Sequence, residues 1–205
     1  MREPPSDPAS QRANDCCRCR RSTRRDLLAL ASLLGLDAVA GALASPARAE
    51  PADERPKEGD LLVALDSDRP TPLEPKDVPT GGPQVIAWPM DPAGGVVRNG
   101  SRLNKVLLLR LHPATLTAPT TERAADGVVA YSAICPHAGC EVSGWDAEQK
   151  ILECSCHFSH YNPREAAAIV DGPATRALPA LPLKLVDGKL VVAKPFTGRV
   201  GIVPT

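Results

Sequence analysis

The chain has 205 residues, a formal net charge of zero and an aromatic content of only 3%. A nucleic-acid-binding protein would carry a basic stripe, so these values argue against a nucleic-acid partner and we expect none. Proline and glycine number 22 and 15, which favours short strands and turns over long helices. The starting expectation is therefore one domain of ordinary size with extensions.

The first 49 residues differ in charge from the rest of the chain. They hold eight arginines and five acidic residues, whereas the remaining 156 residues hold 16 basic and 19 acidic ones. Arg24 and Arg25 precede an apolar run over 27–44. Small residues at Ala47 and Ala49 then form an A-x-A pattern. A basic segment followed by an apolar run and small residues is typical of an export signal.

The paired arginines resemble the twin-arginine export motif. We therefore expect a twin-arginine signal segment over 1–49 and a periplasmic protein. The apolar run has 18 residues and contains Asp37, whereas a membrane-spanning helix needs about 20 apolar residues. Cleavage after Ala49 is thus preferred, but an uncleaved N-terminus that associates the protein with the inner membrane stays open.

Short apolar runs dominate the remainder of the chain. Residues 50–60 are charged and aperiodic, which predicts a linker. Strand-like runs follow at 61–65, 84–88, 105–111, 127–131, 168–170, 183–186 and 189–193. Asp187-Gly188 is a strong hairpin signal, and 113–126 should hold a short helix capped by Thr120 or Thr121. Many short strands separated by turns predict an all-β fold, a small antiparallel β-sandwich.

Two short motifs hold most of the residues that can carry chemistry. The first reads CPHAGC at 135–140, and the second reads CSCHFSHY at 154–161. A covalently attached c-type haem needs C-x-x-C-H, and the second motif is one residue short, which excludes haem. A structural zinc ion would use four ligands and leave two cysteines unexplained, yet a zinc-stabilised binding module stays open. A thiol nucleophile needs only one cysteine, and a pure disulfide framework does not explain the histidines.

Together the two motifs resemble those of the Rieske proteins. The resemblance implies one [2Fe-2S] cluster per chain, with Cys135 and Cys154 on one iron and His137 and His157 on the other. Because two imidazoles replace two thiolates, the oxidised centre is neutral rather than dianionic, and it accepts an electron more readily. His160, beside the second motif, is interpreted as a surface residue rather than a ligand.

The resemblance covers 61–205 and also implies how the site is built. A Rieske [2Fe-2S] domain there would contain a two-loop cluster-binding subdomain at about 132–162, inserted near one end of a β-sandwich. Cys140 and Cys156 would form a disulfide between the loops. Such a clamp resembles the high-potential branch of the family, because Rieske ferredoxins usually lack these two cysteines.

Further positions resemble those that tune and cover a high-potential cluster. Ser159 and Tyr161 match the places where such members hydrogen-bond a bridging sulfide and a cysteine sulfur, which raises the potential. Gly172, Pro173 and Ala174 resemble the proline loop that covers the cluster. These roles are expectations from the resemblance.

Phe158 departs from the quinol-oxidising bc-type members, which typically have glycine there. This aromatic residue, the stretch VVAYSAIC before the first motif and the twin-arginine signal resemble the small subunit of arsenite oxidase. The implied function is to relay single electrons from a periplasmic oxidoreductase, of a molybdenum type, to a c-type cytochrome. The alternative is the iron–sulfur subunit of a quinol–cytochrome c reductase, whose larger partner would be a cytochrome b. Because the sequence offers no independent catalytic acid, base or nucleophile, any enzyme activity should belong to a complex.

Overall fold

The computed structural model describes residues 51–65 and 69–202. The expected signal segment over 1–49, including Arg24, Arg25 and the A-x-A pattern, lies outside these residues and stays a prediction. Within the described ranges, the structure contains no helix that is both long and apolar enough to cross a membrane.

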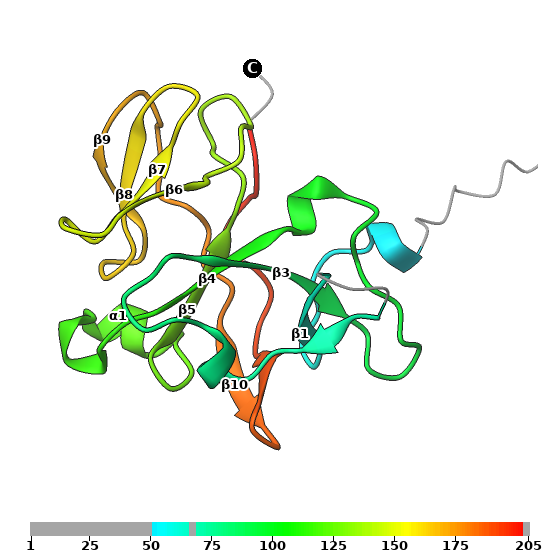
Figure 1. The fold of residues 1–205 in the computed structure, drawn as a ribbon. Coiled ribbons are helices and arrows are strands. Elements are labelled where there is room, and N and C mark those ends of the chain that lie inside the picture. Colours follow the sequence, from blue (N-terminus) through cyan, green and yellow to red (C-terminus); the bar gives the residue numbers. More distant parts are fainter. Residues whose placement is uncertain (1–50, 66–68, 203–205) are drawn as a thin grey trace, which may run out of the picture. The chain divides into compact units, whose positions relative to one another are not determined.

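Short strands make up most of the regular structure (Figure 1). The strands are β1 Leu61–Ala64, β2 Thr71–Pro72, β3 Val85–Met90, β4 Val106–Arg110, β5 Val128–Ser132, β6 Gly144–Asp146, β7 Ile151–Cys154, β8 Ser159–Asn162, β9 Ala168–Asp171, β10 Leu183–Val186 and β11 Lys189–Val192. The helical segments are α1 Ala118–Thr121 and the 3-10 turns η2 Pro51–Asp53, η3 Pro75–Asp77, η4 Arg102–Asn104 and η5 Pro113–Thr115. The expected all-β class is confirmed.

Seven strands form one antiparallel sheet, called the base sheet here. Its order is β10-β11-β1-β3-β4-β5, with β2 beside β1. The sheet curls so that its two ends approach each other: the Ser132 N–H donates to Pro179 O, and the Leu181 N–H donates to Ala130 O, both at 2.9 Å. This curling gives the base the shape of a half-barrel in place of one flat layer.

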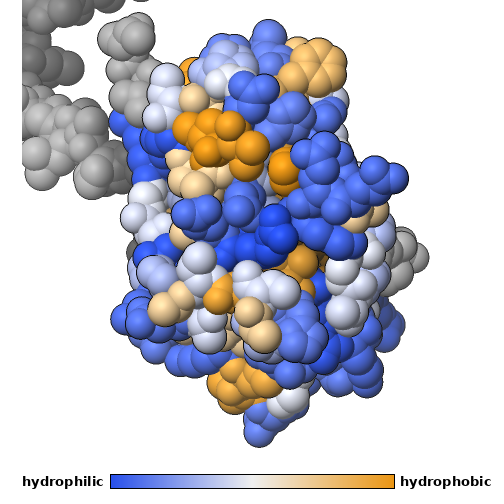
Figure 2. All heavy atoms as spheres, turned by 90° about the vertical axis from the view of Figure 1, so that its left-hand side faces the viewer, coloured by the Kyte–Doolittle hydropathy of each residue, from blue (hydrophilic) through white to orange (hydrophobic). Residues whose placement is uncertain are grey.

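Continuous apolar runs explain the base sheet. All residues of β5 and the first four residues of β4 are buried, because both strands have a covered face on each side. Each fully buried leucine or valine contributes about 1.5–3 kcal/mol of burial free energy. The face on the left of Figure 1, turned toward the viewer in Figure 2, is mostly polar, and its apolar side chains lie in small separate patches.

Four further strands form a second antiparallel sheet, called the insert sheet, in the order β6-β7-β8-β9. It lies between β5 and β10 in sequence, as the expected subdomain does, but β9 continues to Asp171, beyond the expected end at 162. The apolar run at 168–170 predicted β9, whereas β6, β7 and β8 were not predicted. These three strands are three or four residues long and half-buried, so they lack an apolar run.

Two local expectations have different outcomes. The hairpin between β10 and β11 is confirmed, with left-handed φ values of 50° at Asp187 and 77° at Gly188. The expected helix cap is wrong: α1 begins at Ala118, and Thr117 is its N-cap. Proline is tolerated only in the first helical turn, so Pro119 requires the helix to begin just before it and moves the cap to Thr117.

The described part of the predicted linker at 50–60 makes specific contacts with residues that are distant in sequence. Arg98, only 4% exposed, donates from Nε to Asp60 Oδ2 at 2.7 Å and from Nη2 to Asp60 Oδ1 at 3.0 Å. The same guanidinium reaches Glu54 Oε2 at 2.7 Å, and Asn104 Nδ2 donates to Glu54 O at 2.7 Å. The sequence does not reveal these contacts, because Arg98 lies 38 residues after Asp60. The segment is held by the connection between β3 and β4.

Candidate metal centre

Two tight loops hold the residues of the cysteine–histidine motifs. The first loop, residues 133–143, leads from β5 into β6, and the second loop, residues 155–158, joins β7 to β8. In the first loop the Cys135 N–H donates to Cys140 O at 2.8 Å, and in the second the Phe158 N–H donates to Cys154 O at 2.8 Å. The first bond closes its loop internally, and the second ties its loop to the end of β7.

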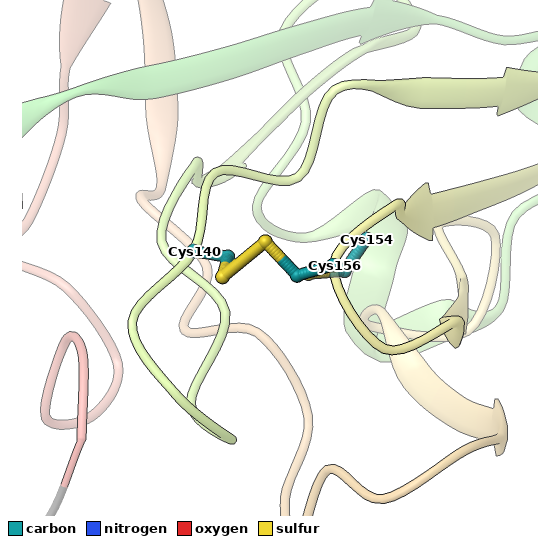
Figure 3. Close-up of side chains that lie close together, drawn as sticks. All are labelled: Cys140, Cys154 and Cys156. Carbon is teal, nitrogen blue, oxygen red and sulfur yellow. A yellow bond between two sulfur atoms is a disulfide. The ribbon is translucent and has the colours of Figure 1, made fainter.

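A disulfide joins the two loops. Cys140 on the first loop is bonded to Cys156 on the second, 16 residues further along the chain (Figure 3). This confirms the expected pairing. The disulfide fixes the separation of the loops, so the remaining cysteines and histidines face each other across a defined gap.

Two buried thiols remain free. Cys135 and Cys154 are each only 1% exposed and have no disulfide partner. Burial raises the pKa of the Cys154 thiol, and the nearby Cys135 sulfur adds to this rise. The Cys140, Cys154 and Cys156 sulfurs lie within 4.8 Å of one another, but the two bonded sulfurs are no longer thiolate donors. Because only the thiolate binds metal strongly, Cys135 and Cys154 are the available sulfur donors.

The two histidine rings meet on the other side of the site. The ring centroids of His137 and His157 lie 4.7 Å apart, and the ring planes stand at 89° to each other. His137 Nδ1 is buried and has no hydrogen-bond partner. A buried polar atom without a partner is costly in free energy and rare in native structures. Coordination of a metal at Nδ1 would remove this cost, so the two imidazoles and two thiols fit a [2Fe-2S] cluster with mixed ligands.

A buried tyrosine contacts one of the thiols. Tyr161 Oη lies 3.1 Å from Cys135 Sγ, and the Tyr161 side chain is fully buried. Burial, together with the Cys135 sulfur, raises the pKa of the Tyr161 phenol. The phenol therefore stays protonated, and it donates its hydrogen bond whenever Cys135 is a thiolate. Tyr161 was expected to bond a cysteine sulfur, and the structure places it beside that of Cys135.

The segment at 172–174 packs directly on the second loop. Gly172 has a φ of 94°, and a Cβ at this position would lie 2.4 Å from Phe158 O and 2.5 Å from Ser159 Cα. Such distances exclude any side chain. The Ala174 N–H donates to Ser159 Oγ at 3.2 Å, so the segment covers β8 where this strand leaves the loop.

The solvent side of the site is formed by the second loop. Phe158 has a left-handed φ of 56° and is 62% exposed, and the neighbouring His157 is also exposed. His160 is directed elsewhere, with its Nε2 3.1 Å from Glu153 Oε2, in line with its interpretation as a surface residue. An electron partner could therefore approach His157 without displacing any protein segment in the described part of the chain.

Sequence reasoning missed two arginines that contact the site's surroundings. Arg102 donates from Nη2 to Gly139 O of the first loop at 2.6 Å. Arg176 donates from both terminal nitrogens to the carbonyl oxygens of Arg199 and Gly201. Nothing in the sequence marks either residue, because each partner is a backbone oxygen brought near only by the fold.

The fold and the donor set define an iron–sulfur protein with an all-β scaffold. Residues 106–182 match the Rieske [2Fe-2S] domain. A protein of Haloferax mediterranei, provisionally named a respiratory nitrate reductase subunit Rieske, is 36% identical over 186 residues, which cover 87% of this chain and 80% of that protein. The chain belongs to the Rieske family, and the cofactor of its domain is a [2Fe-2S] cluster rather than a zinc ion.

Other relatives carry a different complex in their names. The cytochrome bc1 complex Rieske iron-sulfur subunit of Streptomyces lividans is 31% identical over 147 residues, which cover 70% of this chain and 85% of that protein. Among solved structures, the ferredoxin of carbazole 1,9a-dioxygenase from Nocardioides aromaticivorans is 18% identical, with 66% of this chain and 98% of that chain covered and a TM-score of 0.42.

Proposed function

We propose that Cys135 and Cys154 hold one iron of the cluster and that His137 and His157 hold the other. The observation that carries this assignment is the buried, unpartnered Nδ1 of His137, on a ring whose centroid lies 4.7 Å from that of His157. The two free buried thiols supply the remaining donors.

The bound cluster supplies reversible one-electron chemistry, and the chain's own residues set the conditions for it. Burial of Cys135 and Cys154 keeps water from the sulfur side. The Tyr161 hydroxyl stabilises negative charge on Cys135 and so favours the reduced state. On the other side, the exposed His157 gives a partner access to the imidazole edge. One buried face and one open face suit a relay that exchanges electrons but binds no substrate.

We further propose that the protein is the electron-transfer subunit of an exported respiratory oxidoreductase, which passes single electrons from a larger molybdenum subunit to a c-type cytochrome. A relative that covers most of the chain and carries the name of a nitrate reductase subunit supports a partner of this kind. The exposed Phe158 supports an arsenite-oxidase-like surface at the cluster. The relatives named as bc1 subunits support the second candidate, a quinol–cytochrome c reductase subunit whose partner is a cytochrome b.

The twin arginines and apolar run over 24–44 support periplasmic export by the twin-arginine route. A cluster assembled in the cytoplasm needs a route that carries folded proteins. The mass of the protein purified from its own cells tests this directly. A chain that begins at Glu50 supports cleavage of the signal, whereas an intact N-terminus supports an inner-membrane anchor.

The ligand assignment is tested by single substitutions with a matched control. Cys154→Ser or His157→Ala should abolish bound iron and acid-labile sulfide and remove the electron paramagnetic resonance signal of the reduced protein. His160→Ala is the control, because His160 is three residues from His157 but bonds Glu153. Normal iron and sulfide in His157→Ala, or loss of both in His160→Ala, would show that the ligands are assigned wrongly.

The partner is tested on the native complex. Purification of the full chain from its own cells, followed by determination of molybdenum and b-type haem, separates the two candidates. Stoichiometric molybdenum without b-type haem supports the oxidoreductase relay. The reverse result would replace it with the quinol–cytochrome c reductase.

A further inference from the structure

The C-terminal segment at 199–202 lies against the first loop. In Figure 1 the red end of the chain runs beside the yellow-green loop between β5 and β6. A Cβ at Gly201 would lie 3.8 Å from Ile134 Cγ2, and one at Gly139 would lie 3.8 Å from Ile202 Cγ2. The segment is therefore in van der Waals reach of residues on both sides of Cys135.

Four arginines gather around this segment, and we call them the arginine collar: Arg55, Arg102, Arg176 and Arg199. Arg55 and Arg199 line one shallow cavity of about 320 Å³. The Arg176 guanidinium bonds the carbonyl oxygens of Arg199 and Gly201, and Arg102 bonds Gly139 O. The collar thus lies beside the first loop, which Arg102 contacts at the residue before Cys140.

The collar is not neutralised within the described part of the chain. Its hydrogen bonds go to backbone oxygens and, from Arg55, to the neutral Asn104 side chain, and its members form no ion pair there. Other cations of the base are paired, such as Lys105 with Glu141 at 2.7 Å and Arg110 with Asp126 at 2.7 Å. Since the whole chain is formally neutral, the collar is a local concentration of positive charge beside the cluster site.

We propose that the arginine collar is the docking surface for an acidic electron-transfer protein. Charge complementarity is the argument for this occupant: exposed like charges around one loop attract an anionic surface and steer it to the site where electrons pass. Exposed large apolar side chains near the site are few, namely Phe158 at 62% and Ile202 at 52% exposure. Few exposed apolar side chains together with exposed charges suit a transient redox complex.

The inference rests on the proposed function, because the charge matters only if electrons leave near the first loop. It is tested with the reduced holoprotein and two c-type cytochromes, one with an acidic and one with a basic haem-edge surface. A second pair of probes is hexacyanoferrate(III) and the tricationic tris(phenanthroline)cobalt(III). In each reaction one electron passes from the protein to the metal of the acceptor, which falls from the +3 to the +2 state, and no proton moves. Rates are measured by stopped flow at low and high ionic strength.

Arg199→Gln and Arg199→Glu are the informative variants, because the Arg199 side chain makes no bond within the described residues. Lys189→Gln and Lys189→Glu are the controls, because they change the net charge by the same amounts. Lys189 begins β11, in the β10–β11 hairpin at the bottom of Figure 1. With the acidic cytochrome and hexacyanoferrate(III), we expect rates to fall roughly twofold for Arg199→Gln and about fourfold for Arg199→Glu at low salt. The cationic acceptors should react faster, and high salt should remove the differences because it screens exposed charges.

The possible results test the proposed function and the arginine collar separately. Iron content and midpoint potential are measured on every sample, so a protein without a cluster contradicts the proposed function rather than the collar. If the cluster is intact and Lys189 variants change the rates as much as Arg199 variants, the collar is not a docking surface. Arginine-dependent binding to vesicles of anionic lipid, with unchanged rates toward the acidic cytochrome, would also overturn the proposal in favour of a membrane contact.

Discussion

The base sheet and the insert sheet are both antiparallel, but different forces hold them. All buried members of the core of the base sheet are aliphatic. They are Leu62, Ala64, Leu73, Val78, Ala87, Val106, Leu108, Ala125, Val128, Ala130, Leu181, Leu183, Leu190 and Val192. The core under the insert sheet also includes tyrosines and cysteines: Tyr131, Tyr161, Cys135 and Cys154. The core of the base is stabilised mainly by apolar burial, whereas the insert also depends on specific bonds between its side chains.

Left-handed backbone conformations are also distributed unevenly between the insert and the base. Within the described residues, four of the six non-glycine residues with left-handed φ are in the insert: Lys150, Phe158, Ala166 and Ala167. A left-handed conformation costs an ordinary residue about 1–2 kcal/mol, so the insert carries more of this strain than the base, where only Asp126 and Asp187 adopt it. Metal binding can supply folding free energy to such a region. The insert should therefore open before the base does.

The largest effect should come from breaking the base core. Leu108 on β4 is fully buried, and Leu108→Ala should lower the free energy of unfolding by about 2–5 kcal/mol, because the cavity cannot collapse in a packed sheet. Chemical denaturation measures this change. Leu185→Ala on β10 is the control, since Leu185 is 45% exposed and its loss should cost less than about 0.5 kcal/mol. Similar losses in both variants would contradict a base held by burial.

Removal of the disulfide should affect the insert and spare the base. The double variant Cys140→Ser with Cys156→Ser frees a loop of 16 residues, and closure of a loop of this size is worth about 3 kcal/mol. Amide hydrogen exchange should quicken in the first and second loops while the amides of β4 stay protected. Equal quickening in β4 would mean that the two sheets unfold as one unit.

The same contrast explains what the sequence could predict. Six of the seven base strands were predicted, because runs such as 105–111 and 189–193 are mostly apolar and are largely buried, whereas the two-residue β2 was missed. The disulfide of Cys140 with Cys156 was expected only because the motif resembles a known family. Arg98 with Asp60, and Arg102 with Gly139, escaped notice because a lone charged residue gives no sign of a partner that is distant in sequence.

Two glycines with left-handed φ allow a finer test of the insert. Gly172→Ala places a methyl group 2.4 Å from Phe158 O, whereas Gly188→Ala, at a φ of 77°, meets no atom within 4 Å. Both variants bear the conformational cost of about 1–2 kcal/mol, but only Gly172→Ala must also displace the covering segment from the second loop. We expect iron to be lost several times faster from Gly172→Ala, measured with a chelator. Equal rates in the two variants would show that the segment does not protect the site.

The smallest predicted effect separates tuning from stability, and it compares two buried tyrosines. Tyr131 Oη donates to Pro163 O at 2.7 Å, and Tyr161 Oη lies 3.1 Å from Cys135 Sγ. Either Tyr→Phe change removes one hydrogen bond and should cost about 0.5–1.5 kcal/mol of stability. Only Tyr161→Phe removes a bond that favours the reduced cluster. At 59 mV per tenfold change for one electron, its midpoint potential should fall by roughly 20–65 mV, measured by protein-film voltammetry.

Tyr131→Phe should leave the potential unchanged, because its partner is a backbone carbonyl in the segment after β8. Equal shifts in both variants would make the potential a property of overall packing, and the contrast between the base and the insert would then not extend to the redox chemistry.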